Sequence, residues 1–274
     1  MLLDGKELSN KIKQELYSKV RHSLVKPCLA VIQIGDDEAS SVYVKSKEKA
    51  CNDVGIYFKH IKFSEITHER EIVNKIIELN NDEYVNGILI QLPIPEKFDK
   101  NKLINLINKD KDVDGLTDIN AGKLFKFRKN IVPCTPLGIM RLLEEYDIPV
   151  EGKHAVIVGK SDLVGKPLAM LLLEKGATVT VCHSKTNDLG SITKQADILV
   201  SAVGKKDLIT KDMVKNDSVV IDVGIHRNEQ NKLCGDVDFE SVEPLASAIT
   251  PVPGGVGPMT IAMLMKNCVE SVEQ

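Results

Sequence analysis

The sequence lacks tryptophan, paired cysteines and the histidine motifs of zinc enzymes. Its six cysteines are scattered and form no CxxC pair, a spacing that favours free thiols in a reducing compartment over a disulfide framework. No HExxH motif and no clustered His/Cys spacing occur, which argues against a structural or catalytic zinc site. We therefore expect no metal cofactor.

A strong excess of charge and a long apolar run are also missing. The formal net charge is -3 over 274 residues, which gives no reason to expect nucleic acid or an anionic membrane as a partner. No apolar segment reaches the roughly 18 residues of a membrane span, and the N-terminus does not have the pattern of a secretory signal. With 43% hydrophobic residues to fill a core, the sequence predicts a cytoplasmic enzyme or small-molecule binder.

Short apolar runs alternate with stretches of helical periodicity along the chain, which is typical of a parallel α/β architecture. The expected strands are 28–35, 57–63, 87–93, 154–159, 177–183, 196–204 and 218–224, with a short one at 247–250. The expected helices include 4–20, 39–54, 68–80, 100–108, 133–146 and 257–272. We predict two α/β domains, with a dinucleotide-binding, Rossmann-like fold in the second.

The change from the first series of strands to the second predicts a domain boundary at about 120–135. The last helix is too apolar to remain uncovered, so we expect it to pack back on the first domain. The predicted domains are therefore residues 1–125 together with 259–274, and residues 126–258.

Residues 155–184 have the order strand, glycine-containing turn, helix and strand of a dinucleotide-binding fold. Gly159 can make the tight turn at which backbone N–H groups and the helix N-terminus face a pyrophosphate, and Gly165 lets the helix approach the sheet. The match is incomplete, because Ser161 stands where GxGxxG has its second glycine. One alternative is a Walker A loop, which has a shorter gap and a Ser/Thr in place of Pro167. Another is an ordinary βαβ turn without a ligand.

The end of the second strand of this segment favours NADP over NAD. A site for NAD usually has Asp or Glu there to bind the ribose 2′-hydroxyl, but no carboxylate occurs between Glu174 and Asp188. Ser184, Lys185 and Lys160 instead offer hydrogen-bond donors and positive charge, which suit a 2′-phosphate. The alternative is that Lys185 is an ordinary surface lysine.

One lysine of the helix at 39–54 lies on its apolar face. An α-helix advances about 100° per residue, so Lys47 falls on the apolar side, whereas Lys45 and Lys49 point towards solvent. The apolar stripe consists of Ala39, Tyr43, Ala50 and Val54. Desolvation on this face would lower the pKa of Lys47, which makes it a candidate acid/base group; the alternative is a lysine that extends along the stripe to reach water. Tyr43 is either a stacking surface for an aromatic ligand or a core tyrosine.

Two polar residues stand where α/β proteins bind ligands, beyond the carboxyl ends of strands. Gln91 ends the run GILIQLP, and a neutral amide near Lys47 would steady the ammonium without fixing its charge. Asp114 lies in DKDVDG (110–115), which resembles the start of a calcium loop, but Ala121 stands at the closing ligand position, so we reject calcium. A carboxylate at Asp114 would suit a ligand with N–H donors in a row.

Longer motifs extend in a fixed order through nearly the whole chain. They are YVKSKEKACNDVGI, GILIQLPIP, KDVDGLTDINAGKL, PCTPLGIMRLLEEY, VIVGKSDLVGKPLAMLL, VIDVGI and ITPVPGGVGPMT. With these motifs the chain resembles the bifunctional methylenetetrahydrofolate dehydrogenase/methenyltetrahydrofolate cyclohydrolase family. The resemblance implies an active-site cleft between two domains, NADP as cofactor, a homodimer, and a place in the one-carbon metabolism that serves purine biosynthesis.

The reaction that the resemblance implies has two steps. The substrate 5,10-methylenetetrahydrofolate first gives a hydride to NADP⁺, which produces the methenyl cation, and water then attacks that cation to yield 10-formyltetrahydrofolate. The first step needs alignment more than it needs an acid. The second step needs proton transfer, which a lysine with a lowered pKa provides.

The resemblance also implies roles for individual residues. Lys47 is the acid/base group of the hydrolysis, Tyr43 stacks along the folate, Gln91 tunes the lysine, and Asp114 binds the pterin. The expected NADP contacts are Thr135, Gly159, Lys160, Ser161, Ser184, Ile225, Gly257 and Thr260. The loop PGGVGPMT is expected to close over both ligands through Pro253, Gly254, Gly255, Gly257 and Thr260, of which Pro253 and Gly254 contact the folate.

Three other functions have sequence features against them. A dehydrogenase without cyclohydrolase activity, NAD-linked as in some relatives, is disfavoured by Lys47 and by the missing carboxylate at the strand end. A nucleotide-binding regulatory protein without turnover would need no acid/base lysine. A shikimate dehydrogenase is disfavoured by the motif PVPGGVGPMT. Some members of the resembled family have arginine in place of Lys160, which leaves the strength of 2′-phosphate binding open.

Overall fold

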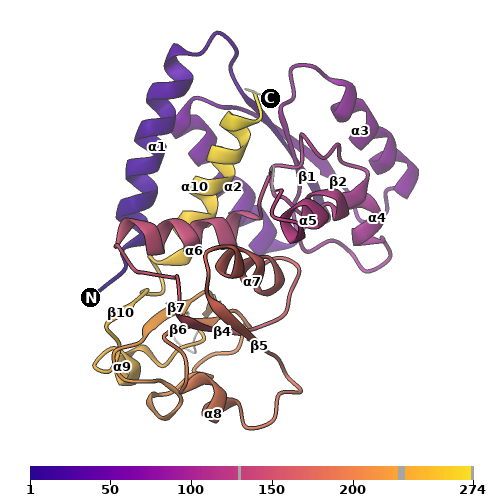
Figure 1. The fold of residues 1–274 in the computed structure, drawn as a ribbon. Helices are drawn as coiled ribbons and strands as arrows, with labels where there is room; N and C mark the ends of the chain where they lie inside the picture. Colours follow the sequence, from indigo (N-terminus) through magenta and orange to yellow (C-terminus); the bar gives the residue numbers. More distant parts are fainter. Residues whose placement is uncertain (129–130, 228–231, 273–274) are drawn as a thin grey trace. The chain divides into compact units, whose positions relative to one another are not determined.

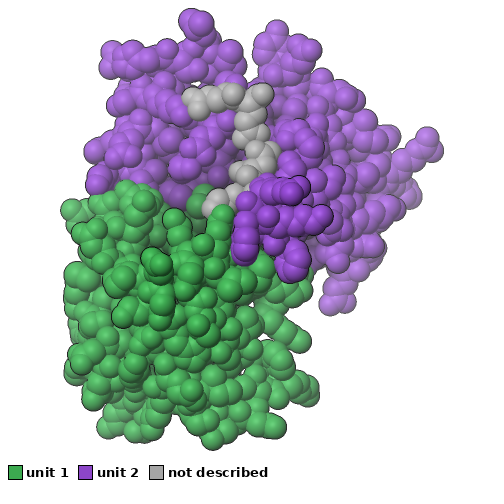
Figure 2. All heavy atoms as spheres, viewed as in Figure 1, with its two compact units in different colours: residues 1–9, 135–260 green, residues 10–134, 261–274 purple. Residues whose placement is uncertain are grey.

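The chain folds into two α/β units, each with its own parallel sheet, which the computed structural model describes over residues 1–128, 131–227 and 232–272 (Figure 1). The N-terminal unit consists of Asn10–Cys134 and Ile261–Gln274, and the C-terminal unit of Met1–Ser9 and Thr135–Thr260 (Figure 2). Among the described residues, no helix is both long and apolar enough to span a membrane. The parallel α/β architecture predicted from the alternating pattern is confirmed.

The N-terminal unit is built on a three-stranded parallel sheet in the order β2-β1-β3. Its strands are β1 (Cys28–Ile34), β2 (Tyr57–Phe63) and β3 (Gly87–Ile90). The central strand β1 is buried at all seven residues, which explains its almost continuous apolar sequence. The helices are α2 (Glu38–Val54), α3 (Glu69–Asn81), α4 (Lys100–Asn105) and α5 (Asp118–Phe125), together with most of α1 (Gly5–His22) and α10 (Val256–Glu270).

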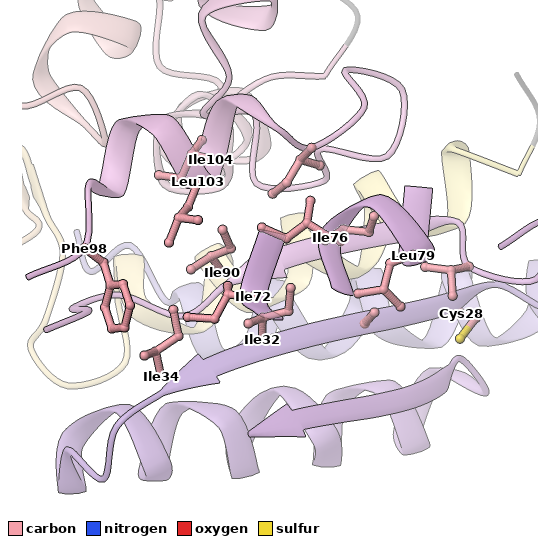
Figure 3. Close-up of a cluster of buried hydrophobic side chains, with 14 residues drawn as sticks. Cys28, Ile32, Ile34, Ile72, Ile76, Leu79, Ile90, Phe98, Leu103 and Ile104 are labelled. Carbon is pink, nitrogen blue, oxygen red and sulfur yellow. The ribbon is translucent and has the colours of Figure 1, made fainter. Parts of the chain in front are cut away.

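A cluster of aliphatic side chains packs on one face of this sheet (Figure 3). Alternate residues of β1, including Ile32 and Ile34, point to that face, because successive side chains of a strand point to opposite sides. Ile72 and Ile76, one turn apart on α3, are fully buried against them. Burying such a side chain contributes about 1.5–3 kcal/mol. The cluster therefore fixes the strand ends, including Ile90 directly before Gln91.

The C-terminal unit is built on a five-stranded parallel sheet in the order β10-β7-β6-β4-β5. Its strands are β4 (His154–Val158), β5 (Thr178–Cys182), β6 (Ile198–Ser201), β7 (Val219–Asp222) and β10 (Ala248–Ile249). The remaining elements are α6 (Cys134–Glu145), α7 (Gly165–Glu174), α8 (Leu189–Thr193), η1 (Lys211–Met213), α9 (Phe239–Val242), and the ribbon of β8 (His226–Arg227) and β9 (Leu233–Cys234). The strand order reverses at β4, and open α/β sheets bind ligands at such a switch point.

The first nine residues group with the C-terminal unit, whereas the sequence placed them in the first domain. Leu3 donates its N–H to the carbonyl of Ile249 at 2.9 Å, and Lys6 donates to Gly254 at 2.8 Å. A Cβ at Gly5 would lie 1.9 Å from the carbonyl oxygen of Gly255. These backbone contacts are invisible in the periodicity of α1. At the other end of the chain, residues 261–274 group with residues 10–134.

The long elements lie where the sequence predicted them, and the differences concern ends and short elements. Strand β3 ends at Ile90, although the apolar run continues to Pro93, a residue without an N–H to donate. Helix α4 ends at Asn105 rather than at residue 108. The elements α5, α9, η1, β8 and β9 were not predicted, because segments of two to eight residues show no clear period.

All six cysteines are free, as the sequence predicted, and five of them are buried. Burial raises the pKa of Cys51 to about 12, so its thiol stays protonated at neutral pH. Only Cys234, in β9, is partly exposed. The buried thiols behave as small core side chains.

Candidate active site

Start and stop signals fix the position of Lys47 within helix α2. Asp37 caps the N-terminus, because its carboxylate accepts a hydrogen bond from the N–H of Ser40 at 2.7 Å. At the C-terminus Gly55 adopts a φ of +85°, the left-handed conformation that glycine permits at low cost. The residues between these caps form one continuous helix, so the direction of Lys47 follows from the helical phase.

The buried face of α2 differs in one residue from the predicted stripe. It includes Val44, Ala50, Cys51 and Val54. Tyr43 was predicted wrongly as part of this face, because 43% of its surface is exposed and Val44 takes the inward position. Lys45 and Lys49 are exposed, as predicted. The side chain of Ala39 lies outside the described residues. Tyr43 thus presents its ring to solvent beside the buried face.

Lys47 donates a hydrogen bond from Nζ to Oε1 of Gln91 at 2.8 Å. Although Lys47 as a whole residue is half-buried, protein surrounds its ammonium end, and this burial lowers the pKa of the lysine. The negative charge of Asp114 raises the pKa, and the effect of burial is the larger of the two. A neutral amide stabilises the ammonium less than a carboxylate would, so Lys47 can both lose and regain a proton.

Gln91 is held in one orientation by the backbone around it. It follows β3 directly, is only 6% exposed, and donates its N–H to the carbonyl of Ile32 at 2.8 Å. Its side-chain Nε2 donates to the carbonyl of Leu92 at 2.7 Å. The amide nitrogen is therefore occupied, and the oxygen faces Lys47.

The segment after α4 carries Asp114 towards the end of β3 at which Gln91 lies. The N–H of Ile88 donates to the carbonyl of Lys111 at 2.7 Å, and Ile88 pairs with Asp112 in a parallel bridge. The segment therefore runs in the same direction as β3. Two residues further along it, Asp114 is half-buried and close enough to Lys47 to affect its pKa.

The two aspartates of DVDG have different environments. Asp112 is buried, and its carboxylate accepts hydrogen bonds from Leu116 N–H (3.1 Å), Thr117 N–H (2.8 Å) and Asn120 Nδ2 (2.9 Å). Its oxygens are thereby used to hold the loop together. Asp114 remains half-buried, and its negative charge raises the pKa of Lys47. Of the two carboxylates, Asp114 is the one that can meet a ligand.

Sequence reasoning missed two buried residues that hold the backbone next to Asp114. Asn267 of α10 donates from Nδ2 to the carbonyls of Val113 at 2.9 Å and Val132 at 3.0 Å. The thiol of Cys134 donates to the same Val113 carbonyl at 3.4 Å, and burial raises its pKa well above the usual range. No local signal marked Asn267, because it follows Lys266 and a second polar residue at that point of α10 reads as an ordinary surface position.

The glycine turn after β4 has the close backbone approach that the sequence predicted. Gly159 adopts a φ of +130°, and a Cβ there would lie 2.4 Å from the carbonyl oxygen of Ala202. Gly165 begins α7, and a Cβ there would lie 2.0 Å from the carbonyl oxygen of Gly159. Ser161 accepts a hydrogen bond from the N–H of Val164 through its hydroxyl at 3.2 Å. The start of α7 is thus pressed against the end of β4.

The predicted phosphate donors lie at the same edge of the sheet. Strands β4 and β5 end level with each other, because Val158 pairs with Cys182. Lys160 and Ser184 each follow two residues later, and both are exposed, as is Lys185. Within the C-terminal unit these side chains therefore extend from neighbouring strand ends, at the place where β4 marks the reversal of strand order.

The other predicted cofactor residues make two contacts within the C-terminal unit. The hydroxyl oxygens of Thr135 and Thr260 are hydrogen-bonded at 2.9 Å. Ile225 follows β7 and is 45% exposed, and a Cβ at Gly257 would lie 3.7 Å from its Cδ1. Ile225 and the first turn of α10 therefore share one surface.

The loop before α10 is shaped by its glycines. Gly254 adopts a φ of +112°, and Gly255 donates its N–H to the carbonyl of Pro251 at 2.8 Å. A Cβ at Gly255 would lie 2.6 Å from that carbonyl oxygen. Pro253, which directly precedes Gly254, is exposed. The loop is a tight turn that only glycine at these two positions permits.

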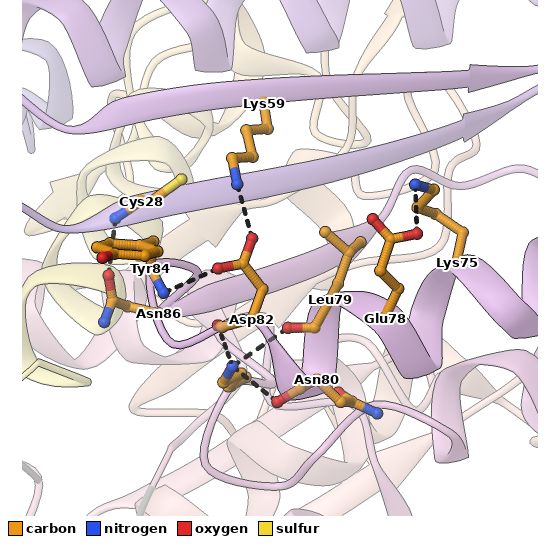
Figure 4. Close-up of polar contacts among 10 residues, drawn as sticks. Cys28, Lys59, Lys75, Glu78, Leu79, Asn80, Asp82, Tyr84 and Asn86 are labelled. Carbon is orange, nitrogen blue, oxygen red and sulfur yellow. Dashed lines mark hydrogen bonds and ion pairs between the residues drawn. The ribbon is translucent and has the colours of Figure 1, made fainter.

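The amino end of β3 carries a separate polar network (Figure 4). Lys111 donates to the carbonyls of Leu79, Asn80 and Asp82 at 3.2, 2.8 and 2.8 Å, and so caps the end of α3. A hydrogen bond from Lys59 lowers the pKa of Asp82. A pocket of about 540 Å³ opens here and includes Asn86, directly before β3. It lies at the opposite end of β3 from Gln91 and is not part of the candidate site.

The fold and these side chains define an α/β protein with a five-stranded parallel sheet in one unit and an enclosed lysine in the other. Residues 3–114 match the family described as "Tetrahydrofolate dehydrogenase/cyclohydrolase, catalytic domain", and residues 133–274 match the "NAD(P)-binding domain" of the same family. The chain therefore belongs to the tetrahydrofolate dehydrogenase/cyclohydrolase family. The sequence-based identification and the Rossmann-like second domain are confirmed.

Similar proteins cover the chain from end to end. The "Bifunctional protein FolD" of Agathobacter rectalis is 53% identical over 276 residues, which are 100% of this chain and 99% of the relative. The crystal structure of bifunctional FolD from Campylobacter jejuni is 50% identical, with a TM-score of 0.98 and coverage of 100% and 98%. The Trypanosoma brucei enzyme, solved with NADP cofactor and an inhibitor, is 35% identical, with a TM-score of 0.94 and coverage of 100% and 97%. A shikimate dehydrogenase from Aquifex aeolicus, 14% identical, shares the fold alone.

Proposed function

We propose that this chain is a bifunctional enzyme in which Lys47 carries the hydrolytic step. It is an NADP-dependent methylenetetrahydrofolate dehydrogenase and a methenyltetrahydrofolate cyclohydrolase. It oxidises 5,10-methylenetetrahydrofolate to 5,10-methenyltetrahydrofolate and hydrolyses that product to 10-formyltetrahydrofolate. The observation that supports the role of Lys47 is its hydrogen bond to the neutral amide of Gln91 at an enclosed position.

The residues at the carboxyl edge of the C-terminal sheet fit NADP. Gly159 and Gly165 pack backbone against backbone, so the positive end of the α7 dipole lies at the end of β4, where it suits a pyrophosphate. Lys160 and Ser184 extend from level strand ends and donate to a 2′-phosphate, with Lys185 adding positive charge. Ser161, Thr135, Ile225, Gly257 and Thr260 complete the proposed contacts. When bound there, NADP⁺ accepts the hydride of the first step.

The dehydrogenase step depends on how the substrate is oriented. Asp114 accepts hydrogen bonds from the pterin, and Tyr43 offers its exposed ring as a stacking surface. The backbone on either side of Asp114 is fixed, by Asn267 at Val113 and by the close packing of Gly115 on Pro133. Precise orientation of reacting groups is the main requirement of a hydride transfer. The loop with Pro253 and Gly254 closes over the bound ligands.

The cyclohydrolase step requires proton transfer. Water that attacks the methenyl carbon must lose a proton, and the neutral amine of Lys47 accepts it, since burial lowers the lysine pKa. Lys47 then returns that proton to the nitrogen that departs as the ring opens. Gln91 keeps Nζ aimed at the reacting atoms through the 2.8 Å hydrogen bond. A neutral amine also avoids repulsion with a cationic substrate.

We also infer that the chain is a cytoplasmic homodimer that serves purine biosynthesis through its one-carbon product. Strand β2 supports the dimer, because it is a seven-residue strand at the edge of its sheet and Tyr57 on it is exposed. The free cysteines support a reducing compartment. Sedimentation velocity measures the dimer directly, and a monomer at micromolar concentration would contradict it.

The two activities are tested in one assay. Methylenetetrahydrofolate is supplied with NADP⁺ or NAD⁺, and reduced cofactor and methenyl absorbance are followed separately. We expect reduced cofactor with NADP⁺ and a methenyl decay faster than in buffer. Absence of reduced cofactor with either nucleotide would refute the dehydrogenase, and decay at the buffer rate would refute the cyclohydrolase.

Lys47→Met tests the assignment of the acid/base group. Cyclohydrolase activity should fall by about 10²–10⁴-fold, the usual contribution of such a group, while part of the dehydrogenase activity remains. Lys45→Met is the matched control, because Lys45 is an exposed lysine of the same helix, and it should keep both activities. Full cyclohydrolase activity in Lys47→Met would sink the assignment.

A further inference from the structure

Asp236 is a fully buried carboxylate in the C-terminal unit that the mechanism above does not use. It lies between β9 and α9 and accepts five hydrogen bonds. The donors are Ser201 Oγ (3.0 Å), the N–H groups of Val203 (2.8 Å), Gly204 (3.3 Å) and Lys205 (2.9 Å), and His226 Nε2 (3.0 Å). Ser201 ends β6 and the next three donors follow it, while His226 follows β7, so one side chain joins two strand ends.

Asp222, the last residue of β7, fixes the position of Asp236. Its Oδ1 accepts the N–H groups of Asp236 and Gly224, each at 2.9 Å, and its Oδ2 accepts the N–H of Val237 at 2.9 Å. A Cβ at Gly235 would lie 1.9 Å from Asp222 Oδ2, and a Cβ at Gly224 would lie 2.1 Å from Asp236 Oδ1. Each carboxylate is thus enclosed by backbone that leaves no space for a side chain.

The turn that Asp236 holds touches the glycine turn of the dinucleotide fingerprint. Ala202 directly precedes Val203 and donates its N–H to the carbonyl of Val158, the last residue of β4, at 2.8 Å. Its own carbonyl oxygen is the atom that a Cβ at Gly159 would approach to 2.4 Å. A displacement of residues 202–205 therefore moves the backbone against which Gly159 is packed.

The two carboxylates also hold Ile225 from both sides. Gly224 donates its N–H to Asp222, and the ring of His226 donates to Asp236. Ile225 between them has a fixed backbone and an exposed side chain. Asp236 thus controls two segments of the proposed cofactor site from a position that has no exposed surface and cannot touch the cofactor.

We propose that Asp236 is the positioning residue of the NADP site, which sets the affinity for NADP by holding the 202–205 turn and Ile225 at the carboxyl edge of the sheet. The inference rests on the proposed function, because it concerns the cofactor of that enzyme. A carboxylate suits this place because it only accepts hydrogen bonds, whereas an amide would turn an NH₂ group towards donors.

The test compares Asp236→Asn and Ser201→Ala with the parent enzyme and with Asp238→Asn. Asp238 is the matched control, because it lies two residues away and its side chain makes no capping hydrogen bond to α9. Two quantities are measured in the full-length chain. One is the dissociation constant of NADP⁺ by titration calorimetry, and the other is cyclohydrolase activity on methenyltetrahydrofolate supplied without NADP.

Asp236→Asn should raise the dissociation constant of NADP⁺ by about tenfold or more, because it leaves buried N–H donors unpaired. Ser201→Ala, which removes one donor, should raise it by about two- to fivefold. Cyclohydrolase activity should stay within about twofold of the parent in both variants, since Lys47, Gln91 and Asp114 belong to the other unit, and independent sites respond independently. Asp238→Asn should leave both quantities unchanged.

Three results would overturn the proposal. NADP⁺ affinity that matches the parent in both variants is the first. Loss of cyclohydrolase activity in proportion to NADP⁺ affinity is the second, because it would indicate a general loss of structure. If Asp236→Asn does not fold, Ser201→Ala decides alone, and unchanged affinity there is the third. Absence of NADP⁺ binding by the parent enzyme would instead refute the cofactor assignment under the proposed function, which is a distinguishable outcome.

Discussion

The two units each enclose a charged side chain, and they treat it in opposite ways. Lys47 in the N-terminal unit makes one side-chain hydrogen bond among the described residues, to the neutral amide of Gln91. Asp236 in the C-terminal unit accepts five. Little replaces the lost hydration of the lysine, which is why burial lowers its pKa. For Asp236, the five protein donors take the place of the water molecules that would hydrate an exposed carboxylate.

The difference separates a group that reacts from a group that holds the backbone. A proton-transferring side chain must keep a site free for its substrate, so it is left with few partners. A positioning side chain is effective only when each of its oxygens is occupied. Asp112 and Asp114 show the same difference within one segment. Asp112 accepts three hydrogen bonds, from Leu116, Thr117 and Asn120, whereas Asp114 acts on Lys47 through its charge.

Gln91→Glu should remove the difference between the two units, because it gives Lys47 a charged partner. A carboxylate in place of the amide oxygen, which lies 2.8 Å from Nζ, favours the ammonium and raises the pKa of Lys47. Less neutral amine is then available at pH 7. Cyclohydrolase activity should fall by about 10–100-fold, and its pH–rate profile should move to higher pH.

Gln33→Glu is the control for this change. Gln33 is also a buried glutamine, on the neighbouring strand β1, but its side chain is hydrogen-bonded to Gly35, Ser41 and His60 rather than to Lys47. Its pH–rate profile should keep the position of the parent profile. The role assigned to Gln91 would be wrong if the profile of Gln91→Glu also stayed in place.

Asn267→Leu should loosen the backbone next to Asp114. The variant leaves the carbonyls of Val113 and Val132 without their donor and should lower the free energy of unfolding by about 1–3 kcal/mol. The KM for methylenetetrahydrofolate should rise by about three- to tenfold, because a small misplacement of a binding group is costly. The dissociation constant of NADP⁺ should not change. Lys266→Leu, which removes only a half-buried ion pair with Glu270 on the same helix, should leave KM unchanged.

The pH dependence of stability tests the raised pKa of the Asp222 carboxylate. Burial, more than any other cause, raises its pKa from 3.8 to about 6. Between these values the folded state binds more protons than the unfolded state, so stability present at low pH is lost as the pH rises through 6. The loss amounts to roughly 2–3 kcal/mol. Urea unfolding at pH 4.5 and pH 7 should show a smaller pH effect in Asp222→Asn than in the parent, and equal effects would contradict the raised pKa.

Local sequence was enough for the long elements and for part of the site. Helical phase selected Lys47 over Lys45 and Lys49, because caps and glycines fix the register of α2. Phase misplaced Tyr43, since a residue at the margin of a face is buried or exposed according to what packs on it. Gly159 and Gly165 were predictable because their conformational demands are local.

The residues that position the site could not be predicted from the sequence. Asn267 acts on Val113 across 154 positions of sequence, and Asp236 acts on Ser201 across 35. Neither distance leaves a periodic signal, and an isolated asparagine or aspartate has many ordinary explanations. The grouping of the first nine residues with the C-terminal unit also depends on a long-range backbone pairing, between Leu2 and Ile249.

The burial of five cysteines leaves Cys234 as the accessible thiol of the chain. For spectroscopy this is an advantage, because a fluorescent or spin label that reacts with accessible thiols attaches at one natural position. That position is two residues from Asp236, in the ribbon strand that pairs with His226. The native chain, without any engineered cysteine, therefore carries a reporter position for cofactor binding.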